Sequence, residues 1–467
     1  MEQLSAMDAS FLYLESATTP QHVLGVMLLD AKGSKGGYTK ERFREVMEER
    51  LHLMPAFERS IVQVPLHLDH PYWVHDHEVD LDEHLFAATL PAPGDLKTLG
   101  RFVGEIGSKL LPRDRPLWEL WLVDGLASGQ VAMVSKMHHS TIYGSAGADM
   151  MANLLDLSPE RRVVDPAPAI PVEPHPSNAG LLGRAALNGA RRPVNLVKGV
   201  AGTAAKIGGI AALMGRSVVT RAPVTLPFSA PRTLINGRLT ARRDTAFTKV
   251  DFADIRFIKD TFGVKVNDVV LAAVTSSLRD YLMARDALPS KPLVASVPVN
   301  LGAGAIAGTD KISAIMVPLP VQTVDAVDQL TDCARLSIQS KGMGETMGLE
   351  SVGDMAELVP PLLMMGGSKL YDGFGLSRLH PPLQSLVVSN MPGPPIPLYL
   401  AGARVDAVYP FGPLLPGSGL NITVLSNMGN LDVGLIACPD LVPDLWEIAE
   451  GFPAAIAELK KRAQARA

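Results

Sequence analysis

The sequence predicts an α/β protein with two domains, and three observations support this fold class. The chain has 467 residues, and a chain of this length rarely keeps a single hydrophobic core. Helix-like and strand-like hydrophobic patterns alternate along it, as they do in α/β folds. A proline-rich stretch from Asp165 to Pro176 interrupts this alternation and is predicted to be an extended linker, because proline at this density blocks helix and sheet alike.

The linker and the segment after it set the expected domain boundaries. We expect an N-terminal domain over residues 1–160, a Pro-rich linker over 161–179, a basic crossover helical segment over 180–222 and a C-terminal domain over 223–467.

In the N-terminal domain, hydrophobic spacing predicts three helices and three strands. The helices are expected over 38–53, 95–110 and 147–157, and the strands over 62–68, 118–123 and 131–137.

In the C-terminal domain, a helix over 254–262 is predicted to end at Gly263, and Asn267 is predicted to cap the next helix. The last helix is expected to begin at Asp444, with Glu447 completing a capping box. Strands are expected over 293–299, 313–319 and 386–388, with a hairpin of 420–425 and 432–438.

The composition excludes several classes of protein. Hydrophobic residues make up 47% and charged residues 19%, so we expect either a large core or a lipid-facing surface. The net charge of -5 argues against a nucleic-acid partner. The N-terminus has no signal-peptide pattern, and no apolar run is long enough to span a membrane. Two cysteines cannot form a disulfide framework, which fits a reducing compartment, and we expect a cytoplasmic protein.

The segment from Gly180 to Arg221 differs from the rest of the chain, because it contains seven basic residues and no acidic one. One interpretation is a basic amphipathic segment lying on anionic lipid, at the inner face of the plasma membrane or at lipid droplets. The alternative is a solvated crossover helix between the domains.

The chemistry is predicted at the end of the 131–137 strand, where His138 and His139 are followed by Gly144. Ligands in α/β folds favour the carboxyl ends of strands, and a histidine there can take a proton from an alcohol. The alternative is a histidine pair whose side chains are satisfied by the local backbone.

Six further blocks surround this motif in order. They are Leu4–Glu15 with Pro20–Val23, Asp80–His84, Arg115–Glu119 (containing Pro116, Leu117 and Trp118), Asn267–Ala272, Ser389–Pro394 and Gly419–Val424. With the histidine pair, they resemble the bacterial wax ester synthase/diacylglycerol acyltransferase family, in particular its mycobacterial triacylglycerol synthases, along nearly the whole chain. That family belongs to the CoA-dependent acyltransferase superfamily.

The resemblance implies two chloramphenicol-acetyltransferase-like domains, each a mixed sheet flanked by helices, with an active-site tunnel between them. It implies O-acyl transfer from acyl-CoA to diacylglycerol, giving triacylglycerol, or to a long-chain alcohol, giving a wax ester. His139 would be the general base and His138 a supporting residue. Acyl-CoA is then a substrate, and no cofactor is expected.

The resemblance also assigns motif or tunnel positions to Tyr143, Gly144, Asn267 and the Pro116-Leu117-Trp118 block. Gly144 would allow close approach of the backbone. Asn267 is either a helix cap or a polar tunnel residue. For Trp118, we expect core packing and not substrate contact.

Two departures from the family pattern stand out. Tyr143 occupies the position of the family's Asp, and Gly308-Thr309-Asp310 replaces a Gly-Asn pair. Because that Asp is usually a structural anchor, its loss need not abolish catalysis. The alternative function is therefore a weakly active or inactive member that binds lipid or a partner.

Other sites are disfavoured. Five histidines between His67 and His84 follow no zinc-ligand spacing, so no metal is expected. The glycines at 302, 304 and 308 lack dinucleotide-fingerprint spacing, and no Gly-x-Ser-x-Gly elbow is present. Diacylglycerol, fatty alcohols and more specialised alcohols all suit the predicted chemistry, and neither acyl length nor oligomeric state follows from these residues.

Overall fold

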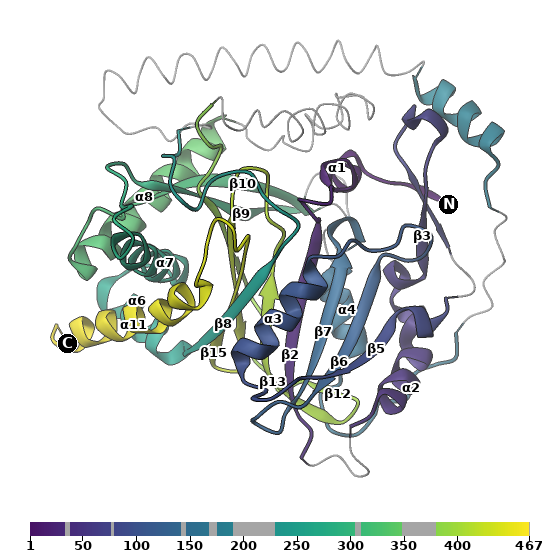
Figure 1. Cartoon of the computed structure of the whole chain (residues 1–467), viewed down its shortest axis with the longest axis horizontal. Helices are drawn as coiled ribbons and strands as arrows, with labels where there is room; N and C mark the ends of the chain where they lie inside the picture. Colours follow the sequence, from purple (N-terminus) through teal and green to yellow (C-terminus); the bar gives the residue numbers. More distant parts are fainter. Residues whose placement is uncertain are drawn as a thin grey trace.

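The computed structural model describes residues 1–32, 38–75, 79–141, 146–167, 175–189, 229–303, 310–347 and 380–466 (Figure 1). Two six-stranded mixed sheets dominate it, and helices lie against each of them. The predicted α/β class with two sheet-rich domains is therefore confirmed.

The first sheet has the strand order β12-β13-β2-β7-β6-β5, in which only β5 and β6 are parallel. Helices α2 (Lys40–Arg50) and α4 (Ala146–Leu154) cover one face, and α3 (Leu96–Gly107) covers the other. The strands are β2 (His22–Asp30), β5 (Leu85–Thr89), β6 (Trp118–Asp124), β7 (Val131–His138), β12 (Tyr399–Leu400) and β13 (Ala403–Phe411).

The second sheet has the order β10-β9-β11-β14-β15-β8. Its strands are β8 (Asp244–Asp251), β9 (Leu293–Ala303), β10 (Asp310–Leu319), β11 (Leu386–Met391), β14 (Leu420–Asn427) and β15 (Asn430–Ala437). The helices on its outer face are α6 (Phe252–Phe262), α7 (Val266–Met283), α8 (Ala326–Met347) and α11 (Leu445–Gln464). The predicted hairpin is confirmed, because β14 and β15 pair antiparallel.

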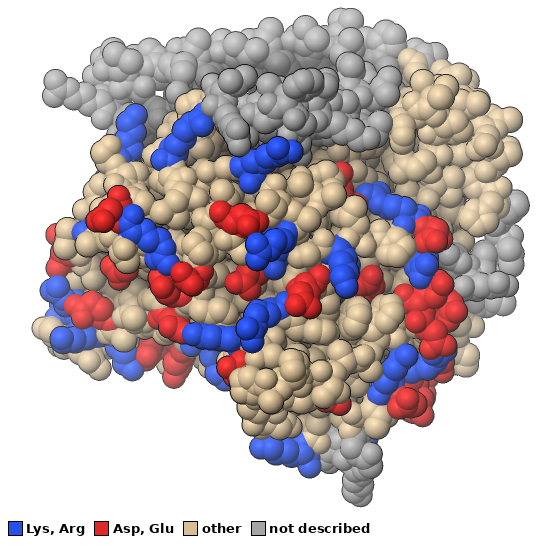
Figure 2. All heavy atoms as spheres, in the orientation of Figure 1, with Lys and Arg blue, Asp and Glu red and all other residues tan. Residues whose placement is uncertain are grey.

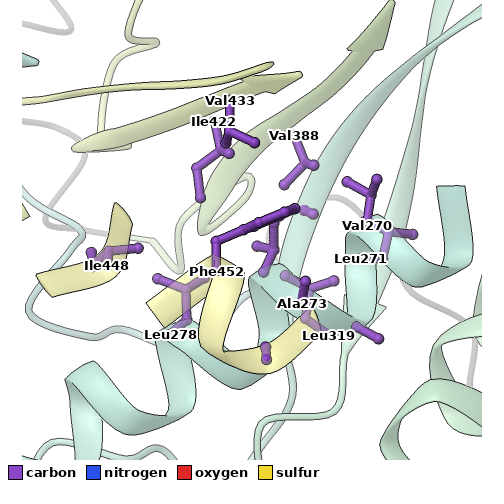
Figure 3. Packing of buried hydrophobic residues seen from close by; sticks show 14 of the residues in the cluster. Val270, Leu271, Ala273, Leu278, Leu319, Val388, Ile422, Val433, Ile448 and Phe452 are labelled. Carbon is purple, nitrogen blue, oxygen red and sulfur yellow. The ribbon is translucent and has the colours of Figure 1, made fainter. Parts of the chain in front are cut away.

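The core of this second half is built from aliphatic and aromatic side chains. Figure 3 shows Leu278 of α7 and Phe452 of α11 packed with Ile422 and Val433 of the sheet. One face of the last helix is buried, and it consists of Leu445, Ile448, Phe452, Ile456 and Leu459. Each Å² of apolar surface removed from water contributes about 25 cal/mol to folding. This cluster is therefore a main source of folding free energy for the second half.

A third, three-stranded sheet lies at one end of the first half. It joins β1 (Glu2–Gln3), β4 (Tyr72–His75) and β3 (Arg59–Val62), and α1 (Ala6–Leu14) follows β1 directly. A helix over residues 178–189 packs Leu181 and Ala185 onto this sheet against Val64 and Tyr72.

Several contacts among the described residues join the two halves, among them a shared sheet and a helix packed on a strand. β12 and β13 lie beyond residue 223 in sequence, yet they complete the first sheet, because β13 pairs with β2 and β12 pairs with β13. Helix α3 also packs closely on β8 and on the residue before it. A Cβ at Gly100 would lie 2.4 Å from the Thr245 carbonyl oxygen, and a Cβ at Gly104 would lie 2.4 Å from the Arg243 carbonyl oxygen. The Thr245 hydroxyl donates to the Gly100 carbonyl at 2.8 Å. The boundaries drawn at 160 and 222 remain a prediction from sequence.

Three local predictions were wrong. The strand expected over 62–68 ends at Val62, because Pro65 opens a 3-10 turn in which Leu66 has a left-handed φ of 58°. Asn267 does not cap α7, which begins at Val266. Instead the Asp268 carboxylate accepts the Lys265 backbone N–H at 2.9 Å.

The third wrong prediction is the capping box at α11. Asp444 is the N-cap but has a φ of 56° and makes no side-chain cap hydrogen bond. The side chains of Asp444 and Glu447 both pair with Arg285 on α7, at 3.3 and 2.8 Å. A tertiary ion pair therefore replaces the local cap.

Acidic and basic side chains are interspersed over the face shown in Figure 2. Among the helices of the described ranges, none is long and apolar enough to cross a membrane.

Candidate active site

The histidine pair lies where β7 ends. His138 is the last residue of the strand and is fully buried, whereas His139 begins a 3-10 turn and is half-buried. The backbone N–H of His138 donates to the Leu117 carbonyl at 3.0 Å, and that of His139 donates to the Gln21 carbonyl at 2.8 Å. The segments before β6 and β2 therefore hold the pair from opposite sides.

The imidazole of His138 is held in one tautomer. Its Nδ1 accepts the Ser140 backbone N–H at 3.2 Å and lies 2.7 Å from the Ser140 hydroxyl oxygen. Because a backbone N–H can only donate, Nδ1 carries no proton and the proton lies on Nε2. That nitrogen is 3.3 Å from Oε2 of Glu15. Burial lowers the pKa of His138, and the Glu15 carboxylate partly opposes this shift.

Glu15 is the centre of a buried polar cluster that the sequence did not assign to the site. Its Oε2 accepts the Gln21 backbone N–H at 3.2 Å and lies 3.3 Å from Nε2 of both His22 and His138. Its Oε1 pairs with the Arg113 guanidinium. Burial alone would raise the pKa of this carboxyl, but His138, His22 and Arg113 hold it well below its usual range.

His139 faces a different environment. Its ring stacks on Phe11 of α1, with the centroids 4.0 Å apart and an interplanar angle of 25°. Burial, together with the neighbouring His138, lowers its pKa to about 4. At neutral pH the ring is therefore neutral, which is the form that can accept a proton.

The Pro116-Leu117-Trp118 block lies beside the histidine pair because β6 pairs with β7. All three residues are buried. The Trp118 indole N–H donates to the Phe57 carbonyl at 3.0 Å, and its ring stacks on His84 at 4.1 Å. Trp118 is thus a core residue, and the block meets the pair through the Leu117 carbonyl.

The remaining predicted residues divide into two groups. Asn267 is the second residue of α7 and is half-buried, in the half of the molecule that carries the second sheet. Tyr143 and Gly144 lie outside the described residues, so their roles stay predictions.

The described histidines near β4 form no metal-binding group. Among the residues that the structure describes, no group of three His, Cys, Asp or Glu side chains could hold a metal. His70 instead lies with Nδ1 3.0 Å from the Tyr13 hydroxyl, and His84 Nδ1 lies 2.7 Å from the Trp118 carbonyl.

Two joined mixed sheets with a histidine pair at a strand end define a class, that of the CoA-dependent acyltransferase fold. The starter condensation domain of rhizomide synthetase shares this fold, with a TM-score of 0.51 at 14% identity over 99% of this chain and 94% of that domain. The wax ester synthase/diacylglycerol acyltransferase from Marinobacter aquaeolei VT8 gives a TM-score of 0.70 at 26% identity, covering 99% of this chain and 100% of that one.

Sequence comparison narrows the class to a family. The wax ester synthase/diacylglycerol acyltransferase catalytic domain matches residues 4–270, and the C-terminal domain of the same family matches residues 309–460. A Mycobacterium tuberculosis protein named as a diacylglycerol O-acyltransferase is 37% identical over 469 residues, which is 98% of this chain and 90% of that protein. A Mycobacterium bovis protein named likewise is 31% identical, with 99% of each chain covered. The chain belongs to the wax ester synthase/diacylglycerol acyltransferase family, and it is an acyltransferase.

Proposed function

We propose that this protein transfers a long-chain acyl group from acyl-CoA to an alcohol, with His139 as the general base and diacylglycerol as the main acceptor. The observation that carries the proposal is the neutral, half-buried imidazole of His139 at the end of β7, with its backbone held by Gln21. The relatives named as diacylglycerol O-acyltransferases support the choice of acceptor.

The chemistry needs one proton carrier and no acyl-enzyme. The His139 imidazole removes the hydroxyl proton as the alcohol oxygen attacks the thioester carbonyl. The tetrahedral intermediate then collapses, the C–S bond breaks, and the leaving CoA sulfur takes the proton back from His139. General-base assistance supplies about 10²–10⁴-fold, so positioning of both substrates must supply much of the remainder.

His139→Ala tests this function. Radiolabelled acyl-CoA is incubated with diacylglycerol or with a long-chain alcohol, and ester formation is measured for wild type and variant. We expect a loss of at least about 10²-fold in kcat for the variant. Wild-type turnover no higher than that of the variant would contradict enzymatic activity on these acceptors and favour the lipid-binding alternative.

Tyr143→Asp tests the departure from the family pattern. We expect no large change in rate, because the family resemblance implies a structural role for this position and not a catalytic one. A large rise would mean that the tyrosine limits the site.

We also propose peripheral contact with anionic lipid through residues 180–221. One support is that this segment has seven basic residues and no acidic one. The other is that Leu182, Arg184 and Leu187 in its described part are exposed, opposite the buried Leu181 and Ala185. Flotation with anionic liposomes is expected to carry the protein upward. Equal flotation after neutralisation of Arg191, Arg192 and Lys198 would contradict the proposal.

A further inference from the structure

We infer that Glu15 is a positioning residue for His139, acting through His138 and through the backbone of Gln21. The inference rests on the proposed role of His139 and adds the group that fixes where its imidazole lies.

The first argument is connectivity. One oxygen of Glu15 accepts the Gln21 N–H at 3.2 Å and faces the protonated Nε2 of His138 at 3.3 Å. The carbonyl of the same Gln21 accepts the His139 N–H at 2.8 Å. Oε2 of Glu15 is therefore connected to His139 by two routes. One runs through His138, the residue before it, and the other through the backbone of Gln21.

The second argument is the kind of group required. Oε1 faces the Arg113 guanidinium, and Oε2 faces the Gln21 N–H and the His138 Nε2–H. The Nε2 of His22, which accepts the Leu111 backbone N–H at 3.4 Å, also lies 3.3 Å from Oε2. A carboxylate accepts at both oxygens, whereas an amide of the same size accepts at only one. In a glutamine at this position, the NH₂ group would face either the Arg113 guanidinium or the donors from Gln21 and His138, and it could accept from none of them. The surroundings of this side chain therefore require a carboxylate.

The third argument is the position of Glu15 on α1. Glu15 is the C-cap of this helix, and its N–H donates to the Phe11 carbonyl at 3.1 Å. Phe11, one turn earlier, stacks on the His139 ring. The last turn of α1 thus contacts the base directly through Phe11 and holds its backbone through Glu15.

The consequence is geometric. A general base must lie within hydrogen-bond reach of the alcohol proton, and a displacement of about 1 Å can cost roughly 10²-fold in rate. The contacts of Glu15 are to Gln21, Arg113 and the two buried histidines, so releasing it loosens the base without removing a proposed substrate contact. The loss should therefore fall on kcat and not on KM.

Glu15→Gln tests this inference in the full-length protein, with CoA release measured at saturating acyl-CoA and diacylglycerol. We expect kcat to fall by about 10²-fold with the KM for acyl-CoA within about twofold of wild type. The matched control is Glu83→Gln, an exposed carboxylate paired with Arg115 at 3.0 Å, for which we expect wild-type kcat. Wild-type kcat for Glu15→Gln, or a loss carried by KM alone, would overturn the inference.

Two further variants separate positioning from folding. In the Glu15→Gln/His138→Asn double variant, the loss in kcat should be smaller than the product of the single losses, because both act on one network. Multiplicative losses would contradict this path. If Glu15→Gln does not fold, the partly exposed Arg113→Gln carries the test: a lower kcat at unchanged KM supports the inference, and an unchanged kcat overturns it.

The two proposals fail in different ways. If wild type and His139→Ala turn over equally slowly, the proposed function fails. If His139→Ala is inactive while Glu15→Gln is fully active, only the positioning role fails.

Discussion

Glu15 and Asp432 are two buried carboxylates in different halves of the molecule, and the protein treats them in opposite ways. Glu15 lies at the end of the first sheet between Arg113, His22 and His138, and its pKa lies well below the usual range. Asp432 lies on β15 of the second sheet, where Oδ2 accepts the Val408 N–H at 2.7 Å and the Asn427 side-chain amide at 3.0 Å. Burial raises its pKa to about 6.

The difference teaches that the partners, and not burial, decide whether a buried carboxyl is ionised here. Burial alone would raise the pKa of both groups. Cationic and imidazole partners reverse that effect for Glu15. For Asp432, the two neutral donors and the charge of Lys249 offset it only in part. The ionised carboxylate lies beside the histidine pair at the end of the first sheet, where we propose the chemistry, while the second sheet contributes a hydrocarbon core (Figure 3).

The largest effect on the free energy of unfolding is expected at a third buried carboxylate, Asp156, which pairs with an arginine. Asp156 accepts two hydrogen bonds from Arg50 at 2.8 and 2.9 Å, and both side chains are almost inaccessible. Asp156→Ala leaves the arginine charge buried without this partner, so we expect a loss of about 3–5 kcal/mol in the free energy of unfolding. Urea denaturation measures it.

The control for Asp156→Ala is the double replacement Arg50→Met with Asp156→Leu. Because it removes both charges, it should cost much less than the single variant. A double variant as unstable as Asp156→Ala would show that packing, and not charge, sets the loss.

Local patterns predicted the fold class and the position of the histidine pair. The 131–137 strand was expected from its own apolar run, and β7 runs from Val131 to His138. His138 and His139 were singled out because they follow that strand directly. Hydrophobic period and strand ends are local properties, so a single sequence carries them.

The unpredicted features depend on contacts between distant segments. Glu15 meets His138 only because β2 pairs with β7, and β13 joins β2 although Phe411 and Leu24 are far apart in sequence. No spacing rule links such positions. The wrong strand over 62–68 had a local cause, since apolar residues at Leu66 and Leu68 fit a strand pattern while Leu66 adopts a left-handed conformation.

A smaller effect, of opposite sign, is expected at Asp432. Its folded-state pKa of about 6 lies above the ordinary value of 3.8, so the fold favours the protonated form. The stability gained from this group is fully present below about pH 4 and is lost as the pH rises through about 6. Asp432→Asn mimics the protonated acid, so it should be more stable than wild type by about 3 kcal/mol at mildly alkaline pH.

The pH dependence gives the sharper test of Asp432. The difference in unfolding free energy between Asp432→Asn and wild type should be near zero at about pH 4 and grow up to about pH 7. A difference independent of pH would mean that Asp432 is ionised in the folded protein throughout this range, as Glu15 is, and the contrast between the two carboxylates would disappear.

The smallest effect is expected where a carboxylate has a cation but is not buried. Glu83 pairs with Arg115 at 3.0 Å, and about half of its side chain is exposed, 49%. Water screens this pair and solvates either charge alone, so Glu83→Gln should change the free energy of unfolding by less than about 1 kcal/mol. Denaturation in low and high salt measures it. A loss as large as that of Asp156→Ala would show that an exposed ion pair stabilises the fold as much as a buried one. Burial would then not explain why the carboxylates differ in their contribution to stability.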